Sequence, residues 1–145
     1  MTEIAFHFNV TDKLVYGCRL LRKAYLSGAN IVVTAGPDVL AELDELLWSF
    51  SPTDFVPHCR ASESETILVG TPVLLAESLV AVPHHGVLVN LGQGTPDGFE
   101  RFERVIEVVT QAEDDRLAAR SRWKYYAGRG YAMKRHDLTS AGEGT

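Results

Sequence analysis

The 145-residue sequence is poor in cysteine, with only Cys18 and Cys59, and it has no C-x-x-C or H-x-x-x-H spacing. Two cysteines cannot hold together a disulfide-rich secreted scaffold, and a domain of this size does not need such bridges. In His58-Cys59 and His84-His85 neighbouring side chains point in different directions, so neither pair converges on a metal ion. We therefore expect a reduced, cytoplasmic protein with no metal and no cofactor, in which Cys18 is buried and inert.

Long apolar runs are also missing. The longest uncharged stretch, from Ser78 to Pro96, contains two prolines, two histidines and three glycines, which excludes a membrane-spanning helix. No basic segment precedes an apolar one at the N-terminus, so we expect no secretory leader. The composition, 46% hydrophobic and 23% charged, is typical of a globular protein. We expect one α/β domain over residues 1–138 and a disordered tail over residues 139–145.

Positive charge is scarce overall, because the formal net charge is −5. The protein as a whole should therefore repel nucleic acid. Seven of the 14 lysines and arginines nevertheless lie between Arg116 and Arg135, a segment without any aspartate or glutamate. This asymmetry indicates either a local anionic partner or a solvated basic helix.

The first half of the chain shows a β-α-β pattern. Residues 3–10 alternate as a strand does, Thr11 and Asp12 are typical helix caps, and Ile31-Val32-Val33 is apolar on consecutive residues. A second helix is expected from Gly36-Pro37-Asp38 to a point before Pro52. Strands apolar on both faces favour a parallel sheet covered by helices on both sides.

The second half is expected to continue this alternation. We predict strands at 66–69, 74–75 and 87–91, a third helix that begins at 95–97, and a fourth at 113–127. The third helix would turn Phe99, Phe102, Ile106 and Val109 inward. The predicted fold is a three-layer α/β sandwich with a mostly parallel, Rossmann-like sheet.

The glycine-rich phosphate loop of nucleotide-binding α/β proteins is missing. The first predicted strand leads into Asn9-Val10-Thr11-Asp12, which contains no glycine. The later segment Gly92–Gly98 has Asp97 where a third glycine would stand, and a carboxylate there would repel a pyrophosphate. We interpret this segment as a turn and a helix cap.

Arg120, Trp123 and Lys124 are the most informative group. On a helix they are related by i, i+3 and i+4, so two cations and an indole share one face. Such a face suits a short acidic peptide that ends in an aromatic residue, whose carboxylate would pair with the cations. It also suits a nucleobase and its phosphate. Alternatively, Trp123 packs into the core and the charges are merely solvated.

These residues also carry a family resemblance. The sequence resembles the chi subunit family of bacterial DNA polymerase III in Leu43–Trp48, in Phe55-Val56-Pro57-His58, and in the helix Leu117–Gly130. The resemblance implies that Arg120, Trp123 and Lys124 form the pocket for the acidic C-terminal tail of single-stranded DNA-binding protein (SSB). Position 123 holds Trp where the family is expected to have Tyr, which keeps the aromatic surface and removes a hydroxyl.

The resemblance further implies a non-catalytic adaptor of the clamp loader. Its second partner would be the psi subunit, bound by Trp48, Phe55, Val56 and Pro57, which could instead pack into the domain's own core. Contact with single-stranded DNA would be indirect, through SSB. Two alternatives remain open: a nucleotide-handling enzyme on a Rossmann-like fold, and a module that binds single-stranded DNA directly through the basic helix.

Overall fold

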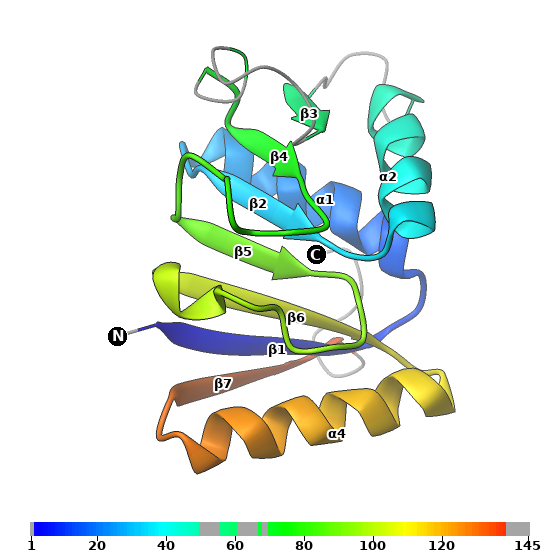
Figure 1. Ribbon diagram of the computed structural model, residues 1–145. Helices are drawn as coiled ribbons and strands as arrows, with labels where there is room; N and C mark the ends of the chain where they lie inside the picture. The colour runs from blue at the N-terminus through cyan, green and yellow to red at the C-terminus, as the bar shows by residue number, and fades with distance from the viewer. Residues whose placement is uncertain (1, 50–55, 61–66, 68–69, 139–145) are drawn as a thin grey trace.

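Seven parallel strands form the central layer of the protein (Figure 1). The computed structural model describes residues 2–49, 56–60, 67 and 70–138. In chain order the elements are β1 (Glu3–Val10), α1 (Lys13–Leu26), β2 (Ile31–Thr34), α2 (Pro37–Ser49), β3 (His58–Arg60), β4 (Val73–Leu75), β5 (Val87–Asn90), the 3₁₀ turn η1 (Phe99–Arg101), β6 (Arg104–Thr110), α4 (Glu113–Gly128) and β7 (Ala132–Asp137).

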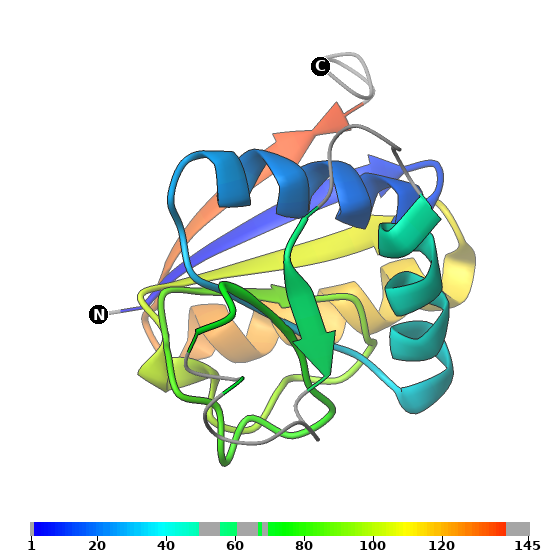
Figure 2. The same cartoon turned by 90° about the horizontal axis from the view of Figure 1, so that it is seen from above.

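The strand order in the sheet is β3-β4-β2-β5-β6-β1-β7, and each pair of neighbours is parallel. Helices α1 and α2 cover one face of the sheet, and α4 covers the other (Figure 2). This arrangement confirms the predicted α/β sandwich. It also brings the first strand, β1, between two strands from the C-terminal half of the chain.

The hydrophobic core consists of two clusters, one on each side of the sheet. In β2, Ile31 and Val33 pack toward α1 and α2, whereas Val32 belongs to the α4 side, and all three are fully buried. Because successive side chains of a strand point to opposite faces, β2 contributes to both core clusters. Cys18 is a buried residue of α1 within the first of these clusters, as predicted. Burial raises the pKa of its thiol to about 12.

The predicted third helix is wrong. Phe99 begins the single 3₁₀ turn η1, and Phe102 directly follows it. Residues 104–110 form the strand β6. Ile106 faces the α1 and α2 layer, whereas Val109 faces α4. The four residues happened to match helical spacing, but the β-branched run of Val and Ile has the stronger preference for a sheet that is buried on both sides.

Other differences concern short or polar segments. The strands β3 and β7 were not predicted, because β3 has three residues and β7 has mostly exposed, charged ones. Of the predicted strand 66–69, the structure describes only Ile67, which is helical. The expected disordered tail, 139–145, lies outside the described residues. The other predicted helices and strands are confirmed within a few residues.

A buried polar cluster joins α4 to the middle of the sheet. Glu107 of β6 is fully buried and accepts hydrogen bonds from Arg122 Nε at 2.9 Å, Tyr126 OH at 2.6 Å and Asn90 Nδ2 at 2.9 Å. Arg122 Nη1 also donates to the Gln93 carbonyl at 2.6 Å. Burial raises the pKa of Glu107, and the Arg122 guanidinium together with the hydrogen bonds opposes that rise. All three partners of the carboxylate are donors, which suits its ionised form.

The first prediction concerns this cluster. Glu107→Gln keeps the shape of the side chain but leaves the Arg122 charge, 2% exposed, without a counter-charge. We expect the free energy of unfolding to fall by roughly 3–5 kcal/mol, measured by urea denaturation. The exposed Glu103→Gln is the matched control and should change stability by less than about 0.5 kcal/mol. Equal stability of the two variants would contradict the structural importance of the pair.

A second polar group lies on the opposite face of the sheet. The His7 ring is hydrogen-bonded through Nδ1 to the Tyr16 hydroxyl and lies 4.6 Å, between ring centroids, from His136 of β7. Burial lowers the pKa of His7 to about 4, and the positive charges of His136, Arg104 and Lys23 act in the same direction. The folded protein therefore favours the neutral imidazole.

The second prediction follows from this lowered pKa. Between pH 6.5, the ordinary histidine value, and about pH 4, the unfolded chain binds a proton that folded His7 does not. Stability should therefore decrease as the pH falls through this window. In denaturation experiments the free energy of unfolding of His7→Gln should depend less steeply on pH. His136→Gln should keep most of the dependence, because burial is the main cause of the lowered His7 pKa. Parallel curves for wild type and His7→Gln would contradict the assignment.

Candidate functional site

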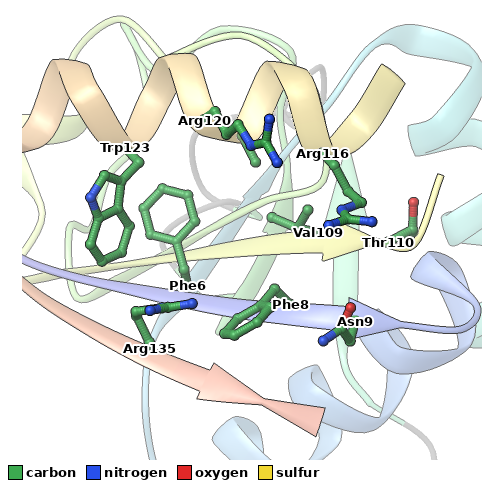
Figure 3. Close-up of a pocket in the computed structure, with 10 residues that line it drawn as sticks. Phe6, Phe8, Asn9, Val109, Thr110, Arg116, Arg120, Trp123 and Arg135 are labelled. Carbon is green, nitrogen blue, oxygen red and sulfur yellow. The ribbon is translucent and has the colours of Figure 1, made fainter. Parts of the chain in front are cut away.

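A groove of about 400 Å³ lies between α4 and the strands β1, β6 and β7 (Figure 3). Its base consists mainly of aromatic side chains, and three arginines surround it. The lining residues are Phe6, Phe8, Asn9, Val109, Thr110, Arg116, Ala119, Arg120, Trp123 and Arg135. Two of the three residues predicted for the tail pocket, Arg120 and Trp123, are among them.

Strand β1 supplies the aromatic floor. Phe6 and Phe8 are two residues apart, so they point to the same face of the sheet, toward α4. The register of β1 on β6 shifts between His7 and Val10, and Asn9 there has φ 64°, a left-handed conformation that asparagine tolerates. This bulge lets Phe8 and Asn9 both line the groove, while Val10 packs on the opposite face.

Helix α4 supplies the upper wall. Arg116, Arg120 and Trp123 follow one another at i, i+4 and i+7, so they lie along one flank of the helix. The Trp123 ring also packs edge-on against Phe6, with 5.1 Å between centroids. Trp123 is thus half-buried and contributes to both the core and the groove. The alternative that Trp123 packs into the core is thus confirmed for part of the ring, and its role in ligand binding stays a prediction.

The beginning of α4 is fixed at the end of the groove. The Asp115 carboxylate accepts hydrogen bonds from the Thr110 backbone N–H at 2.8 Å and from its hydroxyl, and it pairs with Lys13 Nζ at 3.0 Å. Burial of Asp115 favours its neutral form, but these contacts outweigh it and lower its pKa. The contacts hold the turn between β6 and α4, and with it Arg116, in place.

Lys124, the third predicted residue, is exposed and is not among the residues that line the groove. Each residue of an α-helix is turned by about 100° from the last, so Lys124 and Trp123 diverge by about that angle. Lys124 lies one turn beyond Arg120 on α4. Its contribution to ligand binding stays a prediction, as a cation near the groove.

The electrostatic character of the groove comes from Arg116, Arg120 and Arg135. Among the described residues, none of these three guanidinium groups has a carboxylate partner in an ion pair. The Arg135 guanidinium carbon lies 5.0 Å from the Phe8 ring centroid and 5.9 Å from that of Trp123. Unpaired guanidinium groups beside apolar rings can bind carboxylates together with an aromatic side chain.

The residues predicted to face the psi subunit are placed differently from one another. Trp48, at the end of α2, is 63% exposed, and its ring lies 5.1 Å from that of His58. Pro57, which precedes His58, is half-buried, whereas Val56 is 4% exposed and belongs to the core. Phe55 lies outside the described residues. The Val56 side chain therefore anchors the segment and is not available at the surface.

His58 holds this segment against α2. Its Nδ1 is 2.7 Å from the Val56 carbonyl oxygen, and its Nε2 is 3.0 Å from Asp44 Oδ1. The Asp44 carboxylate also lies 3.8 Å from Arg60. Residues 56–60 are thus tied to α2 through Asp44, and the Trp48 ring lies against the His58 ring of this segment.

The usual phosphate position of a Rossmann-like fold is already occupied by the protein. The Asp12 carboxylate accepts hydrogen bonds from the backbone N–H groups of Leu14 and Val15, both at 3.1 Å. These are the free donors of the first turn of α1 that a phosphate would otherwise use. The sequence prediction that Asp12 caps this helix is confirmed.

A second cavity of about 400 Å³ lies at the carboxyl ends of β2 and β5, where such folds bind nucleotides. Its charged lining residues are Glu77 and Asp97, which disfavour an anionic ligand. Within the described ranges, no group of three or more His, Cys, Asp or Glu residues is arranged to hold a metal ion. A search of the same residues finds no helix long and apolar enough to span a membrane.

Of the ten residues that line the groove, the sequence identified only Arg120 and Trp123 as site residues. Arg116 and Arg135 were counted in the basic segment without a role, and Phe6 and Phe8 were assigned only to a strand. The signal for Phe6 and Phe8 was their spacing of two, which places both rings on one face. Nothing in the local sequence indicated that β7 lies next to β1, because that contact depends on the strand order.

Relatives in sequence are subunits of DNA polymerase III, and a solved structure of another protein shares the fold. A DNA polymerase III subunit chi from Pseudomonas aeruginosa is 31% identical over 143 residues, covering 95% of this chain and 98% of the relative. The Escherichia coli subunit chi is 27% identical over 118 residues, covering 80% and 79%. The C-terminal domain of the DEAD-box protein Dbp5 has a similar fold, with a TM-score of 0.59 and 14% identity over 95% of this chain and 91% of that one.

The family model matches nearly the whole described fold, from β1 into β7. It is the model of the DNA polymerase III chi subunit, HolC, and it covers residues 1–134. The groove residues Phe6 to Trp123 lie within this match, and Arg135 lies just beyond it. The resemblance noted in the sequence is thereby confirmed, and the chain belongs to the DNA polymerase III chi subunit family.

Proposed function

We propose that this chain is a non-catalytic adaptor of the replication machinery. It binds the acidic C-terminal tail of SSB in the groove under α4, and it links SSB to the clamp loader through the psi subunit. The observation that carries this proposal is the convergence of three unpaired arginines on a floor of aromatic rings. Family membership supports it, since the relatives are subunits of DNA polymerase III.

The chemistry of the groove suits such a tail. An aromatic side chain at the end of the peptide packs against Phe6, Phe8 and Trp123, which removes apolar surface from water. The carboxylates of the peptide pair with guanidinium groups that have no counter-charge of their own. Because the ring contacts do not depend on charge, part of the affinity should persist at high salt.

The third prediction compares the cation inside the groove with the cation outside it. Arg120→Ala removes a hydrogen-bond donor that lines the groove. It should lower the affinity for a ten-residue acidic tail peptide by about tenfold or more. Lys124→Glu acts through the field near the groove, so its effect should be large at low salt and should shrink as salt rises. Titration of Trp123 fluorescence in a Trp48→Phe background measures both.

The controls for this experiment are the fold and the ligand. Arg120 and Lys124 are both exposed, so neither change should alter thermal unfolding. An oligonucleotide of single-stranded DNA tests the competing function, because an aromatic and basic groove can also stack bases. Unchanged peptide affinity in Arg120→Ala, or oligonucleotide binding that matches the peptide, would contradict the proposal.

The psi-facing surface is proposed around Trp48 and Pro57, with Val56 as its inner support. Trp48 is exposed although it is large and apolar, and tryptophans of this kind dominate the energy of many interfaces. The surface lies at the end of α2, whereas the groove lies on the α4 side of the sheet (Figure 2). The two partners therefore do not compete for the same residues.

The fourth prediction tests this surface. Trp48→Ala should weaken the complex with the psi subunit by about 2 kcal/mol or more, measured by calorimetry, because the exposed ring becomes buried only in the complex. It should leave tail-peptide binding and thermal stability nearly unchanged. The exposed Leu26, 66% accessible on α1, provides a matched control as Leu26→Ala. A large loss of stability in Trp48→Ala would assign the ring to the core.

A further inference from the structure

Arg135 holds a distinct position in the groove. It comes from β7, at the edge of the sheet, where it is paired in register with Phe6 of β1. Its side chain approaches the aromatic floor from the strand side, whereas Arg116 and Arg120 approach it from α4 (Figure 3). The groove thus has positive charge on two opposite walls.

Two rings orient the Arg135 guanidinium. The distances of 5.0 Å to the Phe8 centroid and 5.9 Å to the Trp123 centroid are within the range of cation–π contacts. A guanidinium packed on ring faces keeps its N–H groups directed outward in its own plane, where they can meet a carboxylate with two parallel hydrogen bonds. The group is therefore positioned before any ligand arrives.

The balance of charge indicates how many carboxylates the groove accepts. Three guanidinium groups line a space of about 400 Å³, and none of them is paired with a carboxylate among the described residues. One bound carboxylate would leave two positive charges close together. A ligand with a second carboxylate relieves that repulsion and reaches the opposite wall.

We propose that Arg135 is a further binding residue of the groove, which pairs with an acidic side chain of the peptide while Arg120 and Arg116 hold its terminal carboxylate. This inference rests on the proposed function, because it names the ligand groups for the same site. The groove accordingly selects tails that carry a side-chain carboxylate in addition to the chain end.

The experiment is a set of double-mutant cycles between protein and peptide. The parent peptide has ten residues, acidic side chains and a C-terminal phenylalanine with a free carboxylate. One variant peptide replaces the acidic side chains by their amides, and another carries a C-terminal amide. Each is titrated into wild type, Arg135→Gln, Arg120→Gln and Lys134→Gln by calorimetry.

The expected pattern is reciprocal. Arg135→Gln should lower the affinity for the parent peptide and for the C-terminal amide by about tenfold. Its affinity for the peptide with neutral side chains should fall by less than about twofold. Arg120→Gln should lower the affinity for the parent peptide and for the peptide with neutral side chains by about tenfold. Its affinity for the C-terminal amide should fall by less than about twofold. The loss caused by each arginine therefore disappears only when its own carboxylate is missing.

Lys134→Gln is the matched control for Arg135→Gln. Lys134 is the preceding residue of β7, it is also exposed, and its ammonium lies near Glu3 on the other face of the sheet at 3.4 Å. The same change of charge at Lys134 should lower the affinity for each peptide by less than about twofold. An equal loss in Lys134→Gln would show that only the overall field matters, which would overturn the role of Arg135.

The outcomes separate this inference from the proposed function. If wild type binds the parent peptide and Arg135→Gln binds all three peptides as wild type does, the inference fails and the proposed function stands. A loss in Arg135→Gln that is equal for all three peptides also overturns the specific pairing. If wild type does not bind the parent peptide, the proposed function fails and the inference falls with it.

Discussion

The buried contact between Glu107 and Arg122 determines how α4 lies on the sheet, and the groove depends on that orientation. Arg122 points inward to the carboxylate, and Tyr126, one turn later, donates to the same group. A helix with these two contacts cannot rotate without leaving a charge unpaired in the core. Arg120 and Trp123, which lie together on another flank of α4, are thereby directed to the groove. The polar cluster in the core and the lining of the groove are consequences of one helix orientation.

A charged pair in a core is a weak source of stability, since apolar residues of similar size often pack as well. Its advantage here is specificity of orientation. Apolar contacts alone would hold α4 loosely in rotation, because its buried residues between Asp115 and Tyr126 are only Ala119 and Arg122. The hydrogen bonds of Asp115 to Thr110 fix the beginning of the helix in the same way. Directional contacts at both ends replace the apolar stripe that α1 and α2 possess.

The same cluster explains where the sequence was informative and where it was not. Strand β2 and helices α1 and α2 were predictable because their apolar residues repeat with the period of their own element. Strand β6 was not, because Glu107 interrupts a run of buried β-branched residues and makes it resemble one face of a helix. A buried charge can be recognised only with its partner, and Arg122 is distant in sequence. Strand β7 is exposed and charged, so local composition could not distinguish it from a loop.

For the candidate site, helical spacing predicted the α4 wall of the groove but could not predict the strand wall. Arg120 and Trp123 are close in sequence, so their convergence follows from the geometry of one helix. Phe8 and Arg135 come from opposite ends of the chain, and they meet because β1 lies between β6 and β7 in the sheet. The parallel topology thus places an aromatic strand from the N-terminus beside a basic strand from the C-terminus. Because a helix can present cations from one side only, it is this strand order that gives the groove positive charge on two opposite walls.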